Sequence, residues 1–184
     1  MASCDLLNSG TVEGYLAKVA DWLRKNPFEV ITILIGNGDF VDVQKFVSPV
    51  EASGIADMAY IPQNTTSLQH YAWPTLGELI QQGKRVVLFM DYKADQTRVP
   101  YILDEFTYMW ETPFSPVDPN FPCTIHRPPT QTTDDGKLYM ANHNLNKKLG
   151  KDILIPDKAN LNRTNGESGF GSLGLAAEKC TGMY

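Results

Sequence analysis

The sequence predicts an α/β fold in which helices alternate with mainly parallel strands. Two strongly apolar runs, Val30–Ile35 and Arg85–Met90, lack the alternation of a half-exposed strand and are typical of strands buried on both faces of a parallel sheet. A helical pattern precedes each run, and a third strand is expected at Lys137–Ala141. This alternation is typical of repeated βα units. Such elements can build a doubly wound sheet, whereas a complete (β/α)8 barrel needs eight strands.

The first helix is expected from about Val12 to Lys25. Thr11 can cap its N-terminus, and Glu13 in the first turn suits the helix dipole. Asn26-Pro27 ends the pattern, because a residue before proline avoids the helical conformation. A shorter helix is expected over residues 42–53.

The clearest helix-strand unit begins at Thr75. Thr75 and Glu78 form a capping box, and Gly83 is expected to stop the helix before the second apolar run. A further helix is expected over residues 99–110, and a fourth strand near Cys123–His126.

The composition indicates one packed domain or part of one. Hydrophobic residues make up 42% of the 184 residues and charged residues 20%, with a net charge of -5. The acidic balance argues against a nucleic-acid-binding surface. No apolar run reaches the ~20 residues of a membrane span, and the N-terminus lacks signal-peptide features. The densest basic cluster is Lys147, Lys148 and Lys151, interpreted as a solvated face, with a phosphate or membrane contact as the alternative.

Two weaker features bear on the cellular compartment. Asn64-Thr65-Thr66 and Asn162-Arg163-Thr164 fit the N-glycosylation pattern. The three cysteines, Cys4, Cys123 and Cys180, leave one unpaired if the other two bridge. The alternatives are three buried thiols, or a partner cysteine that is missing from this chain.

Two motif types predict no binding site. Gly169–Gly174 matches the dinucleotide pattern G-x-G-x-x-G, but it follows a polar stretch instead of a strand and is interpreted as a surface loop. His70, His126 and His143 show no zinc-like spacing, so no metal site is predicted.

Polar residues follow each of the three expected strands. Asn37 follows the first strand, Asp91 and Lys93 follow the second, and Asn142 and His143 follow the third. We expect the three strands to be neighbours in one curved sheet. The carboxyl ends of parallel strands would then meet at one rim, and these five residues are predicted to line a substrate-binding pocket. Ordinary loop polarity and capping are the alternative. No nucleophile is paired with a base, so the pattern alone identifies no catalytic residue.

Several long stretches closely resemble one family. They are "SCDLLNSGTVEGYLAKVADWLRKNPFEVITILIGN", "WPTLGELIQQGKRVVLFMDY", "WETPFSPVDPNFPC", "YMANHNLN" and "NRTNGESGFGSLG". Together they resemble the secreted fungal branch of the phosphatidylinositol-specific phospholipase C X-domain-like proteins, the PLC-like phosphodiesterases. The resemblance implies a TIM-like (β/α) barrel with mainly parallel strands. Residues 1–184 would be the central part of this single domain, incomplete at both ends.

The resemblance also implies a mechanism. Two histidines act as general base and general acid, so that the inositol 2-hydroxyl attacks phosphorus and diacylglycerol leaves. An arginine or, in some branches, Ca²⁺ stabilises the phosphate charge. In relatives the second histidine lies just upstream of the segment matching Ser3-Cys4-Asp5, where this chain has Met1-Ala2. Both catalytic histidines are therefore expected to be absent, and Cys4 is expected to pair with a missing cysteine or with Cys180. Asn37 departs from the lysine of some relatives.

The sequence and the resemblance lead to one main prediction of function and two alternatives. The main prediction is a phosphoric diester hydrolase of the phospholipase C type, acting on a phosphoinositide-like lipid in lipid metabolism and inactive as this chain stands. The alternatives are a non-catalytic secreted or cell-surface binding module derived from the same barrel, and an unrelated small α/β domain. The expected partners are a phospholipid or small phosphodiester and, at most, a peripheral membrane contact. No nucleic acid and no cofactor are predicted, and the protein is expected to be secreted or at the cell surface.

Overall fold

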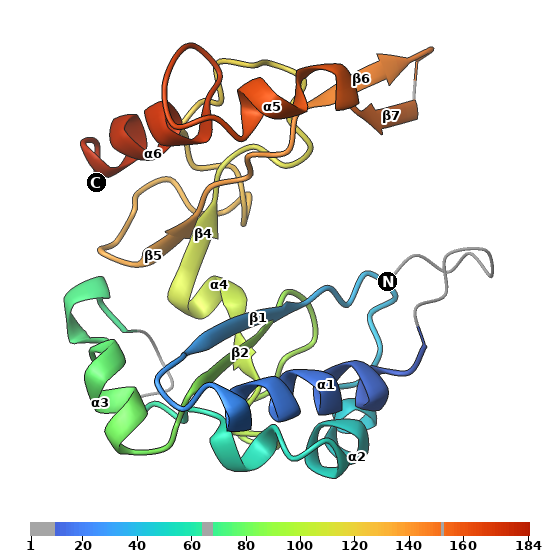
Figure 1. Cartoon of the computed structure of the whole chain (residues 1–184), viewed down its shortest axis with the longest axis vertical. Helices are drawn as coiled ribbons and strands as arrows, with labels where there is room; N and C mark the ends of the chain where they lie inside the picture. The colour runs from blue at the N-terminus through green and yellow to red at the C-terminus, as the bar shows by residue number, and fades with distance from the viewer. Residues whose placement is uncertain (1–9, 64–67, 152) are drawn as a thin grey trace. The chain divides into compact units, whose positions relative to one another are not determined.

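The computed structural model describes residues 10–63, 68–151 and 153–184 of the chain. The chain divides into two compact units, Met1–Thr107 and Tyr108–Tyr184, and each has its own sheet (Figure 1).

The first unit is built on a parallel sheet in the order β1-β2-β3. Its strands are β1 (Ile31–Ile35), β2 (Val86–Met90) and β3 (Leu103–Asp104). All five residues of the central strand β2 are buried, which confirms the prediction for that run. The same prediction is wrong for β1, whose Thr32 and Leu34 are exposed. β1 is an edge strand with one face packed against the core, so only alternate residues are covered.

Helices α1 (Val12–Lys25) and α2 (Gln44–Ala52) pack against one face of this sheet. Helix α1 has the predicted bounds, and the Thr11 hydroxyl accepts a hydrogen bond from the Gly14 amide at 3.0 Å. Helix α3 (Leu76–Gln81) begins at the predicted capping box. Both helices therefore begin where side-chain capping satisfies the first amides. The remaining helices of this unit are η2 (Ala56–Met58) and η3 (His70–Ala72).

The second unit holds a two-stranded parallel sheet and a separate hairpin. The parallel pair is β4 (Met109–Glu111) and β5 (Leu138–Met140), and the antiparallel hairpin is β6 (Asn146–Leu149) and β7 (Ile153–Pro156). Helix α4 (Glu105–Tyr108) directly precedes β4 in the chain. The helices of the second unit are η4 (Lys158–Asn160), α5 (Leu161–Thr164) and α6 (Leu173–Thr181).

A disulfide joins α6 to the long loop after β4. Cys123 and Cys180 are bonded, with their Cα atoms 5.3 Å apart. This pairing overturns the expected alternative of a Cys4–Cys180 bridge, and Cys4 itself lies outside the described residues.

The prediction of a partial TIM-like barrel is wrong. The described residues form small separate sheets of two or three strands, and no closed barrel is present among them. The third expected strand exists as β5, but it pairs with β4 and not with β2. Residues 99–110, expected as one helix, contain β3, α4 and the first two residues of β4, and the expected strand at Cys123–His126 is loop. The chain is therefore a mixed α/β protein.

Candidate functional site

In the first unit, the polar residues after β1 and β2 meet as predicted. The Asn37 amide donates a hydrogen bond to Asp91 Oδ1 at 2.6 Å. The nearly buried Asn37 side chain donates to the Val41 and Tyr92 carbonyls, each at 2.8 Å, and its Oδ1 accepts from the Val41 amide at 3.0 Å. Asn37 thus clamps two loops at the carboxyl edge of the sheet. Its contact with a substrate stays a prediction.

Two residues beside this clamp have a left-handed backbone. Phe40 has φ 54° and Lys93 has φ 64°, a region that side chains other than glycine rarely occupy. The Phe40 amide donates to the Asn37 carbonyl at 2.9 Å, and its ring lies 4.9 Å from that of Tyr92. Lys93 is exposed at the same edge. The clamp therefore holds an aromatic pair and a lysine in a defined conformation at the strand ends.

In the second unit, a buried ion pair lies at the carboxyl end of β4. Glu111 is fully buried, and its Oε1 lies 2.6 Å from Nη1 of Arg127, whose side chain is 17% exposed. Their backbones also pair: the Glu111 amide donates to the Arg127 carbonyl at 2.8 Å. The Arg127 guanidinium lies 5.4 Å from the Phe114 ring centroid, within cation–π range. The guanidinium is thus held by an ion pair and by an aromatic ring, while the Arg127 side chain as a whole keeps some exposure.

Asn142 completes this cluster. Its Nδ2 donates to the second Glu111 oxygen at 2.8 Å and to the Thr112 carbonyl at 3.0 Å. Its amide donates to the Thr112 hydroxyl at 2.8 Å. Both carboxylate oxygens of Glu111 therefore accept a hydrogen bond, which is how a buried carboxylate is stabilised.

His143, the next residue, has a packing role. Its Nε2 lies 2.9 Å from the Thr164 carbonyl, and its ring lies 3.7 Å from that of the buried Phe121. His126 is exposed beside Arg127, and the exposed His70 lies in the first unit. The five predicted residues thus form two groups, Asn37, Asp91 and Lys93 in one unit, and Asn142 and His143 in the other.

Sequence reasoning missed Glu111 and Arg127. Residues 99–110 were read as a helix, so no strand end was expected at Glu111. The stretch "MWET" could have indicated a strand end at Glu111, because the acidic residue directly follows apolar residues and precedes a Pro-rich loop. Nothing local, however, marks Arg127 as its partner 16 residues away.

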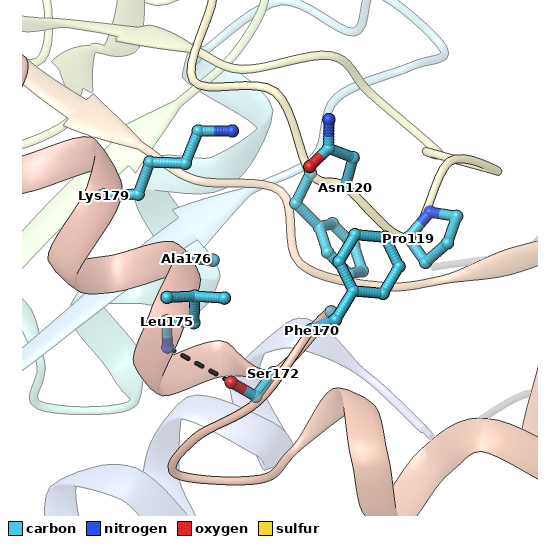
Figure 2. A pocket seen from close by; sticks show the side chains of 9 residues that line it. Pro119, Asn120, Phe170, Ser172, Leu175, Ala176 and Lys179 are labelled. Carbon is cyan, nitrogen blue, oxygen red and sulfur yellow. Dashed lines mark hydrogen bonds between the residues drawn. The ribbon is translucent and has the colours of Figure 1, made fainter.

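A small pocket elsewhere in the second unit does not fit a headgroup. Figure 2 shows Phe170, Pro119 and Leu175 around it, with Lys179 on the neighbouring turn of α6. Its volume of about 30 Å³ suits one or two water molecules and not an inositol phosphate. Among the residues that the structure describes, no group of three or more His, Cys, Asp or Glu is placed to hold a metal ion. Within the same residues, no helix is long and apolar enough to span a bilayer.

This geometry defines a mixed α/β protein with polar clusters at the carboxyl ends of parallel strands. A family model described as PI-PLC X 1 matches residues 1–184. The chain is 57% identical, over 98% of its length, to an uncharacterized secreted protein of Arthroderma benhamiae. It is 44% identical, over 99% of its length, to PI-PLC X domain-containing protein 1 of the same fungus. The chain belongs to the PI-PLC X family.

The chain covers only part of the length of these relatives. The chain spans 42% of the length of the secreted protein and 59% of that of PI-PLC X domain-containing protein 1. A PI-PLC X domain-containing protein of Arabidopsis thaliana is 30% identical over 98 residues, which are 52% of this chain and 22% of that protein. No solved structure is significantly similar to the chain.

Proposed function

We propose that the chain is part of a phospholipase C-like phosphoric diester hydrolase that acts on a phosphoinositide-like phosphodiester in lipid metabolism. Family membership supports the class of reaction. The observation that carries the proposal is the part-buried cluster of Glu111, Arg127 and Asn142 at the carboxyl edge of the β4–β5 pair.

Arg127 is the group we assign to the phosphate. A guanidinium is always charged, and its planar fork can donate to a carboxylate and to a phosphate oxygen at the same time. Glu111 fixes the orientation of Arg127 from the buried side, while the Arg127 side chain keeps some exposure. A fixed cation stabilises developing negative charge better than a mobile one, because it needs no reorganisation during the reaction.

We assign the hydroxyls of the headgroup to polar residues beside Arg127. Asn142 is held beside Arg127 by its contacts with Glu111 and Thr112. We propose that Asn142 binds the polar part of the substrate beside Arg127. In the first unit, Asp91 and Lys93 stay predicted substrate-binding residues of a separate group, in which Asn37 accepts and donates the hydrogen bonds that hold the loop.

Proton transfer is assigned to no residue of this chain. His143 Nε2 faces the Thr164 carbonyl and its ring is packed against Phe121, which favours a structural role. This observation also favours the second candidate function, a non-catalytic secreted or cell-surface binding module with the same phosphate-binding residues.

Binding and turnover are measured in separate experiments. Binding is measured by titration calorimetry with inositol 1-phosphate. The variants are Arg127→Gln, Arg127→Lys, which keeps the charge, and Arg163→Lys, an exposed control in the same unit. We expect Arg127→Gln to weaken binding about tenfold or more, since a charge-assisted hydrogen bond contributes roughly 1.5–3 kcal/mol. Arg127→Lys should bind at an intermediate affinity, and the control should bind normally. No binding by the parent chain, or full binding by Arg127→Gln, would contradict the role of Arg127.

Turnover is measured as release of cyclic inositol phosphate from phosphatidylinositol vesicles. We expect little or no release from this chain, because proton transfer is assigned to none of its residues and such a group contributes on the order of 10²–10⁴-fold in rate. The comparison is the full-length PI-PLC X domain-containing protein 1 of Arthroderma benhamiae, of which the chain spans 59%, and release by that protein would support the hydrolase. Comparable turnover by both would point to His126 and His143 as catalysts, and binding without turnover by either would favour the binding module.

Secretion is part of the proposal, supported by the name of the Arthroderma benhamiae relative. Glycosylation stays a prediction: the Asn162 side chain is exposed on α5, but Thr164 of that triplet is buried. Asn64 of the other triplet lies outside the described residues.

A further inference from the structure

The parallel sheet of the first unit has an open edge along β1. The Ile31 amide donates to the Arg85 carbonyl, next to β2, at 2.9 Å. Backbone groups alternate in direction along a strand, so those of every second residue from Ile31 face β2, whereas those of Thr32 and Leu34 face away from it. Outside the β1–β2 pair, no hydrogen bond within the described residues involves the amide or carbonyl of Thr32 or Leu34. These backbone groups are therefore available to another strand.

β1 also lacks the features that usually protect an edge strand. Natural edges carry charged side chains, proline or a bulge, which prevent pairing with other chains. The strand reads ITILI, without charge, proline or glycine, and all of its residues are in register with β2. On the face opposite α1, Leu34 keeps 38% of its surface exposed. The edge is thus suited to pairing with a second uncharged strand.

Two aromatic side chains of α1 are exposed on one flank of the helix. Tyr15 is 58% exposed and Trp22 is 46% exposed. They lie about two turns apart, and each directly precedes a buried leucine of the core, Leu16 or Leu23. One position along a helix is a rotation of about 100°, so both rings lie on the same side of the core-facing stripe. We call Tyr15 and Trp22 the aromatic flank.

The aromatic flank lies on the side of the open edge. Arg24 follows the buried Leu23 and is therefore on the opposite flank, where its guanidinium lies close to Gly54 at the end of α2. Helix α2 in turn lies towards β3, because the hydroxyl of Tyr101, just before β3, donates to Glu51 Oε1 at 3.3 Å. Since α2 is on the β3 side of α1, the aromatic flank is on the β1 side, beside the open edge.

The charges of α1 have opposite signs at its two ends. Figure 1 shows that α1 runs opposite to β1 along the sheet. Glu13 is exposed in the first turn of α1, at the carboxyl end of β1, and Lys25 is exposed in its last turn, at the amino end. A two-fold pair of antiparallel β1 strands would bring the Glu13 end of each helix towards the Lys25 end of the other. Lys18, between them, lies on the solvent side and stays hydrated at the rim.

We propose that this edge joins two copies of the chain. β1 of each copy pairs antiparallel with β1 of the other about a two-fold axis at Ile33. Thr32 of one copy then lies opposite Leu34 of the second copy, and each such pair exchanges two backbone hydrogen bonds. Both α1 helices lie on the same face of the continuous sheet, where their aromatic flanks pack against each other. The same patch is used on both copies, so the contact closes as a dimer.

A second copy is favoured over an unrelated strand because the backbone groups of the edge and the charges of α1 are both self-complementary. The inference does not depend on the phosphodiesterase proposal, because association is measured without substrate.

Sedimentation velocity over a range of chain concentrations measures the association. We expect a monomer–dimer equilibrium whose dimer fraction rises with concentration. Leu34→Lys places a charge on the edge, and Tyr15→Ala/Trp22→Ala removes the aromatic flank. Each should weaken dimerisation about tenfold or more, because edge charges oppose strand pairing and truncated interface aromatics commonly cost this much. In hydrogen exchange, the Thr32 and Leu34 amides of the unaltered chain should become protected as its concentration rises, a measurement that needs no substitution.

Charge reversal tests the two-fold arrangement. Glu13→Lys alone brings two lysines together at each end of the helix pair, and Lys25→Glu alone brings two glutamates together. Each variant should dimerise about tenfold more weakly than the unaltered chain at low salt. A mixture of the two variants should form a heterodimer with near-normal affinity, since each lysine then faces a glutamate. Mixing would not repair a loss of folding stability, so this rescue is specific to the interface.

Control variants make matched changes away from the edge. Leu76→Lys alters an exposed leucine of α3, and Tyr71→Ala/Phe170→Ala removes two exposed rings. Both should dimerise like the unaltered chain, and urea unfolding identifies any variant that is not folded. The proposal is overturned if the unaltered chain stays monomeric, if the edge and flank variants dimerise as well as the controls do, or if mixing the charge variants restores nothing. Assemblies that grow beyond a dimer would overturn the closed two-fold contact.

Discussion

Replacing Glu111 by glutamine tests whether the buried cluster is built as an ion pair. The two side chains have nearly the same shape, so the change leaves packing intact and alters charge and hydrogen bonding. Glu111 Oε1 lies 2.6 Å from the Arg127 guanidinium, and Oε2 lies 2.8 Å from Asn142 Nδ2. Glutamine offers one acceptor and one NH₂ group, so one of these two donors must face another donor.

The expected cost follows from burial. Removing one partner of a buried ion pair typically costs ~3–5 kcal/mol, because the other charge stays behind uncompensated. Glu111 has no exposed surface, but Arg127 is 17% exposed, so water can partly solvate the remaining cation. We therefore expect the free energy of unfolding of the second unit to fall by about 3 kcal/mol, at the lower end of that range.

The measurement is equilibrium unfolding in urea, followed by circular dichroism and by tryptophan fluorescence, to which the buried Trp110 next to Glu111 contributes. Glu178→Gln, an exposed change in α6, is the control and should shift stability by no more than about 0.5 kcal/mol. A double-mutant cycle with Arg127→Gln should give a clear coupling energy. If Glu111→Gln costs as little as the control, or if the coupling energy is zero, the cluster does not hold Arg127 in the way proposed.

Three further changes have defined expectations. Asn37→Ala should cost about 1–3 kcal/mol in urea unfolding because it removes the donor to the part-buried Val41 and Tyr92 carbonyls, and a cost near zero would refute the loop-clamp role. Cys123→Ser should cost about 4 kcal/mol, the loop entropy for a bridge between residues 57 positions apart, and an unchanged melting temperature on reduction would contradict this. Hydrogen bonds, first from Asn160 and second from Lys147, hold the pKa of Asp157 below its usual value of 3.8. The contribution of Asp157 to stability is therefore present above pH 3.8 and is lost as the pH falls through the lowered pKa. Asp157→Asn should therefore flatten stability in this acidic range, and an unchanged pH profile would show that these contacts add nothing.

The candidate site was partly predictable. Asn37 and Asp91 follow neighbouring strands and meet at the carboxyl edge of their sheet, as expected. The expectation that Asn142 joins them on the same sheet is wrong, because β5 pairs with β4. Glu111 and Arg127 were missed because β4 has only three residues and follows directly on α4, which leaves no room for a strand signal in the sequence.

The sequence by itself determined the features that depend on near neighbours. A Thr11 hydroxyl reaches the Gly14 amide within one turn, and the Thr75–Glu78 box is equally local, so the helix starts are encoded where they occur. The tertiary structure alone decided which distant segments meet: β5 beside β4, Glu111 beside Arg127, and Cys123 bonded to Cys180. Each of these pairings closes a loop of the chain, and its free energy depends on burial and on partner geometry that local residue patterns do not contain.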